Sequence, residues 1–326
     1  MKTTLANAKI LVTGGAGFIG SYVVKLLLKN EASSVVILDN LCRGSHENMR
    51  NFISDPRVTF VEGDIRNKEL LEACIHGTDY IFHMAALRIN ACAANPSDGF
   101  DVMIKATFEL AQLCVKHHVK KVIYSSSASV YGLAQHFPTP ETDNPYDNQT
   151  FYGAAKLWGE QLFRNYFFMY GLDYVALRYF NVYGPGMDTD GKYTEVMIKW
   201  LDCIHNNKNP LIYGDGSTTM DFVYVKDVAE ANVRALLSDI TDETFNIGTG
   251  VETSLKELLE LMLKVNDSTL QPEFREQNLV NPVSRRRADT TKAANMLGFQ
   301  ASFSIENGLA DLSKWYFQRK TQYVTD

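Results

Sequence analysis

A glycine-rich turn near the start of the chain constrains the fold more than any other stretch. An apolar run leads into residues 14–20, GGAGFIG, and a helical apolar pattern continues through Leu28. Gly14 permits a tight turn, Gly17 lets a phosphate approach the backbone, and Gly20 lets helix and strand pack closely. The free N–H groups at the start of that helix favour a pyrophosphate. The stretch therefore predicts the opening βαβ unit of a dinucleotide-binding fold.

An acidic residue in the right place supports this prediction. Residues 34–39, SVVILD, have the pattern of a second buried strand that ends in Asp39. A carboxylate about 20 residues past the glycines can accept the ribose hydroxyls of an adenosine. The alternative is a plain βαβ turn that ends in a surface aspartate.

Composition excludes several classes of protein. A chain of 326 residues can bury a large core, and a net charge of −6 without a basic stripe argues against a nucleic-acid partner. Five cysteines without a C-x-x-C pair indicate reduced thiols and no disulfide framework. We expect no signal peptide at the start, and the sequence has no apolar run of membrane-spanning length. We therefore expect a cytoplasmic protein that binds no membrane.

Strand and helix patterns alternate through the first half of the chain. Further strands are predicted at residues 58–65, 80–86, 121–127 and 174–180, with helices at 67–74, 100–116 and 152–170. This alternation predicts an α/β fold with a Rossmann-type, doubly wound parallel sheet. His83 has no partner at metal-binding spacing, so we interpret it as a core histidine with satisfied hydrogen bonds and expect no metal. His117 and His118 are interpreted as a solvated helix end.

The pattern loosens after about Gly184, where glycine, proline and aromatic residues become frequent. We predict a nucleotide-binding lobe at residues 1–183 and a smaller substrate-binding α/β lobe at 184–326, some segments of which return to the first lobe. Expected elements of the second part are helices at 192–206, 226–237 and 254–263, and strands at 211–213 and 221–225.

Three residues carry the predicted chemistry. Tyr152 and Lys156 are spaced i, i+4, which places both side chains on one face of a helix, and Ser127 ends a serine-rich strand. A phenol has a pKa near 10, and a neighbouring ammonium together with an oxidised nicotinamide would lower that pKa. Tyr152 would then take a proton from a substrate alcohol whose oxygen Ser127 binds. The alternative is a chance helical pair.

These motifs together resemble the extended short-chain dehydrogenase/reductases, and within them the NAD-dependent sugar-nucleotide epimerase/dehydratase family. The matching stretches cover nearly the whole chain: residues 13–20, 38–41, 63–65, 84–86, 125–132, 152–156 and 178–185. The likeness is greatest to enzymes of the UDP-glucose 4-epimerase type. It implies tightly bound NAD in the first lobe, a nucleoside-diphosphate sugar in the second, and a homodimer built as a four-helix bundle from helices near 100–117 and 152–170.

The motifs and the resemblance give the expected site residues. Catalysis is assigned to Ser127, Tyr152 and Lys156. Substrate binding is assigned to Arg88, Ser127, Asn181 and Arg286. Expected contacts of the cofactor are Gly14, Gly17, Phe18, Ile19, Gly20, Asp39, Asn40, Arg43, Asp64, Ile65, Met84, Ala85, Ala86, Ser125, Tyr152, Lys156, Tyr179 and Val182.

The residues after the catalytic serine separate the reactions of the family. Members that dehydrate the sugar have Asp and Glu there, whereas this chain has Ala128 and Ser129. Removal and return of a hydride at C4 is then the simplest cycle, which predicts an epimerase acting on a UDP-sugar by default. The alternatives are a net 4-dehydrogenase or reductase of a nucleotide sugar, possibly one with another base, a 4,6-dehydratase, and a non-catalytic protein that senses NAD.

Three departures from the family pattern concern the ligands. Met220 stands where the family has a diphosphate-binding arginine, and a second such arginine is missing near Leu279. Residues 103–107, MIKAT, lack a polar residue that usually contacts the cofactor. The triplet at residues 285–287, RRR, can replace the missing charge or form a solvated loop. If that segment is extended, Arg286 faces the ligand, because side chains alternate along a strand.

Overall fold

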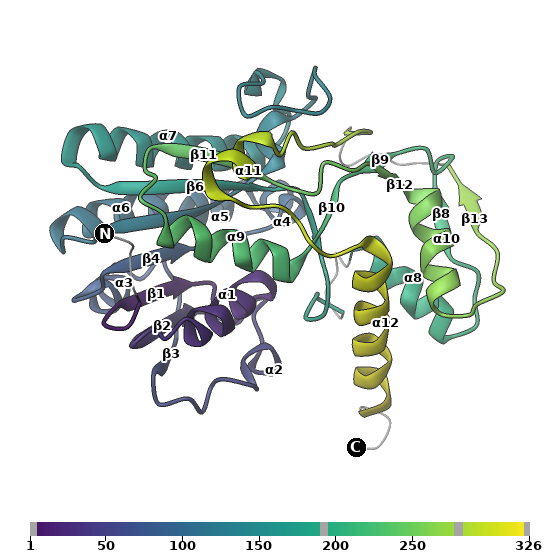
Figure 1. Ribbon diagram of the computed structural model, residues 1–326, viewed down its shortest axis with the longest axis horizontal. Coiled ribbons are helices and arrows are strands. Elements are labelled where there is room, and N and C mark those ends of the chain that lie inside the picture. The colour runs from purple at the N-terminus through teal and green to yellow at the C-terminus, as the bar shows by residue number, and fades with distance from the viewer. Residues whose placement is uncertain (1–4, 190–194, 277–282, 323–326) are drawn as a thin grey trace.

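A parallel sheet forms the centre of the protein. The computed structural model describes residues 5–189, 195–276 and 283–322. Within them the sheet has seven strands in the order β11-β6-β5-β4-β1-β2-β3, and every neighbouring pair is parallel (Figure 1). Its strands are β1 (Lys9–Thr13), β2 (Ser34–Asp39), β3 (Val58–Glu62), β4 (Tyr80–His83), β5 (Lys121–Ser127), β6 (Asp173–Tyr179) and β11 (Glu243–Ile247). The predicted doubly wound α/β fold is confirmed.

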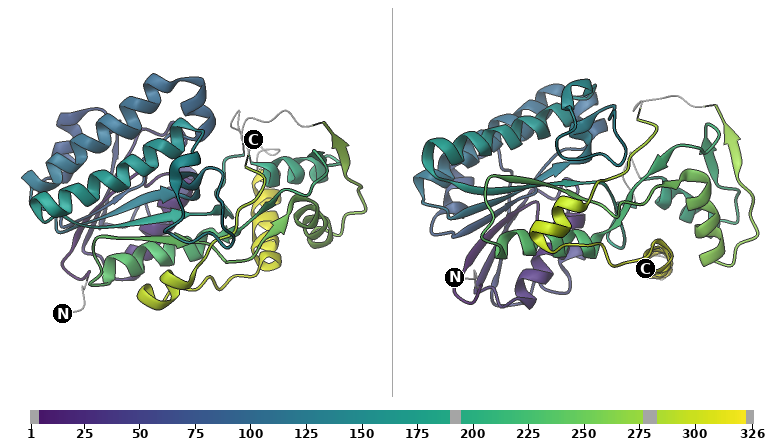
Figure 2. Two further views of the ribbon diagram at one scale, coloured as in Figure 1. Left: turned by 90° about the horizontal axis from the view of Figure 1, so that it is seen from above. Right: turned by 45° about the horizontal axis from the view of Figure 1, so that its top comes forward.

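Helices cover both faces of this sheet (Figure 2). One face packs on α3 (Lys68–Ile75), α6 (Ala106–Lys116) and α7 (Phe151–Tyr170), and the other packs on α1 (Phe18–Lys29), α9 (Val225–Leu237) and α11 (Thr291–Leu297). Because side chains alternate along a strand, Ile10 and Val12 of β1 join one core and Leu11 joins the other. This explains why the central strands have continuous apolar sequences.

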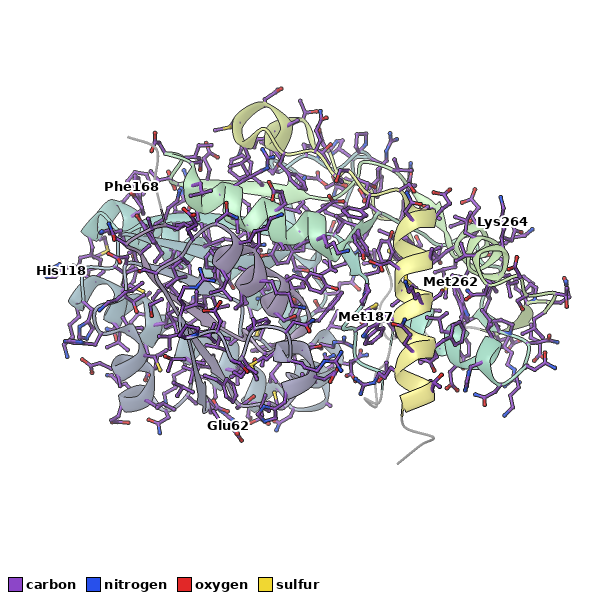
Figure 3. The ribbon with its side chains drawn as sticks, turned by 60° about the horizontal axis from the view of Figure 1, so that its bottom comes forward. Glu62, His118, Phe168, Met187, Met262 and Lys264 are labelled. Carbon is purple, nitrogen blue, oxygen red and sulfur yellow. The ribbon has the colours of Figure 1, made fainter. Side chains whose placement is uncertain are left out.

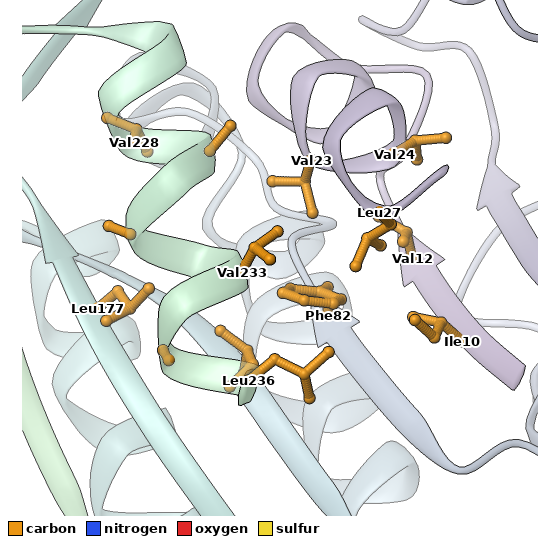
Figure 4. Close-up of a cluster of buried hydrophobic side chains, with 14 of the residues drawn as sticks. Ile10, Val12, Val23, Val24, Leu27, Phe82, Leu177, Val228, Val233 and Leu236 are labelled. Atoms are coloured by element: carbon orange, nitrogen blue, oxygen red, sulfur yellow. The ribbon is translucent and has the colours of Figure 1, made fainter. Parts of the chain in front are cut away.

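The core between α1 and α9 fixes the start of the first helix. Val23 and Leu27 of α1 and Val233 and Leu236 of α9 converge over Phe82 of β4 (Figure 4). Each of these side chains is almost completely buried, which contributes roughly 1.5–3 kcal/mol per large apolar residue. The glycine-rich turn that precedes α1 is thereby anchored to the sheet.

The helix predicted at residues 100–116 is not regular. It consists of α5 (Pro96–Phe100), a π-helical turn η1 (Asp101–Lys105) and α6. The wide turn changes which residues face inward, so Val102 and Met103 are buried, and the Met103 sulfur lies 3.4 Å from the backbone nitrogen of Leu87. This change explains why the sequence has apolar residues on more than one face of the predicted helix.

The second lobe has its own core. Its elements are α8 (Val196–His205), β8 (Leu211–Tyr213), β9 (Thr219–Met220), β12 (Thr253–Ser254), α10 (Leu255–Val265), β13 (Glu273–Arg275) and α12 (Ile305–Gln322). Trp200, Leu259, Met262 and Leu312 pack together between α8, α10 and α12, whereas Lys264 points to solvent (Figure 3). The predicted helix at 192–206 begins at Val196 in the structure; residues 192–194 lie outside the described residues.

The chain passes between the lobes several times. β7 (Asn181–Tyr183) leaves the first sheet and pairs with β10 (Phe222–Tyr224), after which α9 and β11 return to the sheet. α10 then belongs to the second lobe, α11 to the first and α12 again to the second. The remaining short elements are α2 (His46–Met49), α4 (Ile89–Ala94), η2 (Ala128–Tyr131) and η3 (Pro145–Asp147).

Candidate functional site

The glycine-rich turn leaves the start of α1 open to a ligand. Gly14 has a φ of +74°, and a Cβ there would lie 2.8 Å from the Ala85 nitrogen. A Cβ at Gly20 would collide with the Gly14 carbonyl oxygen, so glycine is needed where α1 packs against the turn. No side chain caps α1 and its first turn has no acid. Its backbone N–H groups and positive dipole therefore point at the edge of the sheet.

A cavity of about 280 Å³ lies at this edge, where the strand order reverses between β1 and β4. Parallel sheets bind nucleotides at such a switch point. Its lining contains many of the predicted cofactor residues, namely Gly14, Gly17, Asp39, Asn40, Arg43, Asp64, Ile65, Met84, Ala85 and Ala86. Phe18, Ile19 and Gly20 instead form the first turn of α1 beside it.

Polar contacts preorganise this cavity. The Asp39 carboxylate accepts hydrogen bonds from the backbone nitrogens of Ala16, at 3.0 Å, and Leu41, at 2.9 Å. Burial raises the pKa of Asp39, and these backbone hydrogen bonds act in the opposite direction. Arg43 forms an ion pair with Asp188 at 3.1 Å, so its charge is already matched.

A second cavity of about 540 Å³ opens where the two lobes meet. Its lining includes the predicted residues Arg88, Ser127, Tyr152, Tyr179, Asn181, Val182 and Arg286. Ser125 and Lys156 are absent from this lining and are buried beneath it. We call this cavity the interlobe cleft.

Lys156 lies below the Tyr152 ring. Its ammonium donates a hydrogen bond to the Ser125 carbonyl oxygen at 2.6 Å and lies 5.8 Å from the centre of the Tyr152 ring. Burial lowers the pKa of Lys156 to about 8. The helix α7 places both side chains on one face, as the i, i+4 spacing predicts.

The prediction of a lowered pKa for Tyr152 concerns the complex with an oxidised nicotinamide and stays a prediction, because the structure describes the protein alone. Burial raises this pKa, while the nearby Ser127 hydroxyl and the charges of Arg286 and Arg88 oppose the rise. Desolvation of the phenolate therefore outweighs the nearby charge in the absence of a ligand.

Two polar networks that support the site were not predicted. The Tyr179 hydroxyl lies 3.0 Å from Ser125 Oγ and donates to Asn232 at 2.8 Å. One turn after Lys156, the buried Glu160 accepts from Ser126 Oγ and forms an ion pair with Arg178 at 2.7 Å. The i, i+4 spacing of Lys156 and Glu160 was the only sequence signal for the second network.

The arginine triplet divides as alternation requires. Arg285 forms an ion pair with Glu252 at 2.6 Å, and Arg287 Nε donates to the Gly250 carbonyl oxygen at 2.9 Å. The half-buried Arg286 faces the interlobe cleft. The triplet is thus neither a uniformly solvated loop nor a set of three equivalent residues.

Arg88, a predicted substrate contact, forms an ion pair with Glu195 at 3.2 Å across the cleft. Met220 also lines this cleft, beside Arg286. Leu279 lies outside the described residues.

The histidines have structural contacts. His83 is buried, and its two ring nitrogens lie 2.9 Å from Thr13 Oγ1 and 3.0 Å from Thr107 Oγ1. This matches the interpretation of a satisfied core histidine. His117 is half-buried and contacts Glu72 at 2.9 Å, so it is less solvated than predicted.

Other features restrict the kind of site. In the described ranges, no three His, Cys, Asp or Glu side chains gather closely enough to hold a metal ion. All five cysteines are free thiols. No helix within the same ranges has the length and apolarity needed to span a bilayer.

A doubly wound sheet with an uncapped first helix, an aspartate after the second strand and a Tyr-Lys pair beside an interlobe cleft defines the class of two-lobed, nucleotide-binding α/β proteins. The chain belongs to the NAD dependent epimerase/dehydratase family, whose model matches residues 10–248. The predicted family resemblance is confirmed.

Individual relatives match nearly the whole chain. UDP-glucose 4-epimerase of Mycolicibacterium smegmatis is 35% identical over 317 residues, which are 96% of this chain and 100% of that protein. The structure of UDP-N-acetylglucosamine 4-epimerase from Methanobrevibacter ruminantium M1, in complex with UDP-N-acetylmuramic acid, has a TM-score of 0.91 and 33% identity, covering 98% of this chain and 100% of that one. UDP-glucose 4-epimerase of Thermotoga maritima, with UDP-glucose, has a TM-score of 0.89 and 34% identity, covering 96% and 99%.

Proposed function

We propose that this protein is an NAD-dependent epimerase acting at C4 of a nucleoside-diphosphate sugar, a UDP-sugar by default. The observation that carries the proposal is the residue set at the floor of the interlobe cleft. Ser127 and Tyr152 line it, and the positions after Ser127 hold a buried Ala128 and Ser129 instead of carboxylates. Glu195 is the acid in the described lining, and it is paired with Arg88. The cleft therefore supports proton transfer at a hydroxyl better than elimination of water.

The residues of the smaller cavity fit NAD. Asp39 would accept the ribose hydroxyls of the adenosine, and the open N-terminus of α1 would bind the pyrophosphate. When bound, NAD would supply reversible hydride transfer at the sugar carbon and a positive charge beside Tyr152. The smaller cavity would enclose NAD between Gly14, Gly17 and residues 84–86. This enclosure supports the further proposal that NAD stays bound through turnover.

Tyr152 is the proposed acid and base. Tyr152 and Ser127 line the cleft side by side, where both can contact a substrate C4 oxygen. Tyr152 takes the proton from that oxygen and returns it after the sugar has turned. Lys156, fixed to the Ser125 carbonyl, would keep a positive charge below the phenol at neutral pH, because its pKa is about 8.

We also propose a homodimer. Large apolar side chains are exposed on α6 and α7, among them Phe108, Phe168 and Met169, and Phe168 lies at the outer surface in Figure 3. Pairing these two helices with the same helices of a second copy would bury this surface in a four-helix bundle.

One experiment tests the catalytic proposal. Purified protein is denatured to release and quantify NAD, and untreated protein is incubated with UDP-glucose and UDP-N-acetylglucosamine without added cofactor while NMR follows the C4 epimers. We expect the purified protein to contain bound NAD and to form the epimer. In Tyr152→Phe, epimer formation should be absent or slow, whereas the NAD content should be unchanged. Product that forms only with stoichiometric added NAD would instead identify a dehydrogenase. Inactivity toward all nucleotide sugars would favour a non-catalytic protein.

A further inference from the structure

Arg286 is held in the interlobe cleft by its backbone. Its amide nitrogen donates to the carbonyl oxygen of Thr219 at 3.0 Å, so the segment runs alongside β9. The two neighbouring arginines turn away to the partners described above. The side chain between them is thereby forced toward the cleft, beside Met220.

The Arg286 guanidinium has no hydrogen-bond or ion-pair partner in residues 5–189, 195–276 and 283–322. The nearby acids have other contacts: Glu195 pairs with Arg88, and Asp147 accepts from Gln135 at 3.3 Å. Burial lowers the pKa of Arg286 to about 10, which still leaves it charged at neutral pH. A half-buried guanidinium that faces a cleft without a partner among the described residues is available to pair with an anionic group on a ligand.

Arg286 lies at the reacting end of the cleft. Its side chain lines the cleft together with Ser127 and Tyr152. Arg286 also lines a small adjoining recess whose walls include Ser129, Gly132 and Thr150. These residues come from the segments that position Ser127 and Tyr152, so the guanidinium faces the place of the hexose.

The diphosphate has other positive groups available. Lys199, in the first turn of α8, lines the same cleft, and no side chain caps that helix. A lysine and an open helix N-terminus together suit a phosphate group. The charge of Arg286 is therefore left for a group on the sugar.

We propose that the hexose of the natural nucleotide sugar bears a carboxylate, and that Arg286 forms an ion pair with it. This inference rests on the proposed function, because it assumes that the sugar lies against Ser127 and Tyr152. An arginine fork matches a carboxylate in two parallel hydrogen bonds and discriminates against a neutral hydroxymethyl group.

Calorimetry of the NAD-loaded protein tests the inference with four ligands. UDP is the control without a hexose, and UDP-glucose is the control with a neutral hexose. UDP-glucuronic acid has its carboxylate on the ring, and UDP-N-acetylmuramic acid has it on a side arm. We expect at least one acid to bind about tenfold or more tighter than UDP-glucose. The acid that does so identifies where the carboxylate lies. Arg286→Met should remove this preference and leave binding of UDP and the NAD content unchanged, and Arg285→Met, the matched neighbour, should change neither.

Two results would overturn the inference. If Arg286→Met lowered the affinity for UDP and for the acids by the same factor, Arg286 would be a diphosphate contact. If the acids bind no tighter than UDP-glucose, or not at all, the natural sugar does not bear the proposed carboxylate. Because binding is measured without turnover, these results are distinguishable from failure of the epimerase proposal. A protein that epimerises UDP-glucose but does not prefer acids contradicts only this inference, and one that prefers acids without turnover contradicts only the epimerase.

Discussion

Replacing Glu160 by glutamine should destabilise the protein and alter the pH dependence of its proposed activity. The side chains of Glu160 and Arg178 are only 3% and 8% exposed, and they share two hydrogen bonds of 2.9 and 2.7 Å. Removing one partner of a buried ion pair costs about 3–5 kcal/mol, because the other charge remains buried. Arg178 keeps its bonds to the Tyr131 hydroxyl and the Glu141 carbonyl oxygen, so we expect the lower end of that range, about 3 kcal/mol.

Urea denaturation measures this loss directly, and an unchanged m value shows that the two states being compared are the same. Arg164→Gln is the matched control on the same helix: Arg164 is exposed and lies 3.6 Å from Asp242, so its loss should cost less than about 1 kcal/mol. If Glu160→Gln cost no more than this control, the buried pair would not stabilise α7 as argued.

The same variant has a second readout. The negative charge of Glu160 raises the pKa of Lys156, which burial lowers to about 8. Without that charge Lys156 loses its proton at lower pH, so the alkaline limb of the rate profile should move to lower pH. A purely structural loss would lower the rate at all pH values alike and leave the limb in place.

Four further outcomes follow from the site. Tyr152→Phe should lower kcat about 10²–10⁴-fold while bound NAD and the melting temperature stay unchanged, and near-normal turnover would exclude Tyr152 as the base. NAD should bind more tightly than NADP, because a 2′-phosphate would meet the buried Asp39 carboxylate and Arg43 is occupied by Asp188; competition titration with tighter NADP binding would contradict this. Gly20→Ala should reduce the NAD content of the purified protein, since the new Cβ displaces α1 from the glycine-rich turn; full NAD occupancy would show that the turn adapts. Phe168→Asp should yield monomers by light scattering if α7 lies in the proposed dimer interface, and an unchanged mass would place the interface elsewhere.

Local patterns explain which parts of the fold could be predicted. The glycine-rich turn, the acid at the end of β2 and the Tyr152–Lys156 spacing are short-range features, and each has a direct consequence for backbone conformation or helix face. The strand β2 was predicted with the bounds that the structure shows. Parallel strands then place the ends of β1, β2 and β4 at one edge without further information.

The features that could not be predicted depend on long-range contacts and on burial. The pairing of Arg88 with Glu195 joins residues far apart in sequence, so no local pattern indicates it. The rise in the pKa of Tyr152 depends on how completely the cleft removes water, which spacing cannot report. The π-helical turn η1 changes the inward face of a helix within a stretch that is apolar on several sides.

The repeated passage of the chain between the lobes limits how the protein can be divided. β11 lies at the edge of the first sheet and pairs with β6 through residues 243–247, far beyond the predicted boundary at 183. A fragment that ended at residue 183 would expose the unpaired edge of β6, and exposed strand edges promote aggregation. It would also lack α9, which packs on the core side of α1. The substrate-binding lobe is not one continuous segment, so it cannot be exchanged as a unit between relatives. Changing the substrate specificity therefore requires substitution of individual cleft residues.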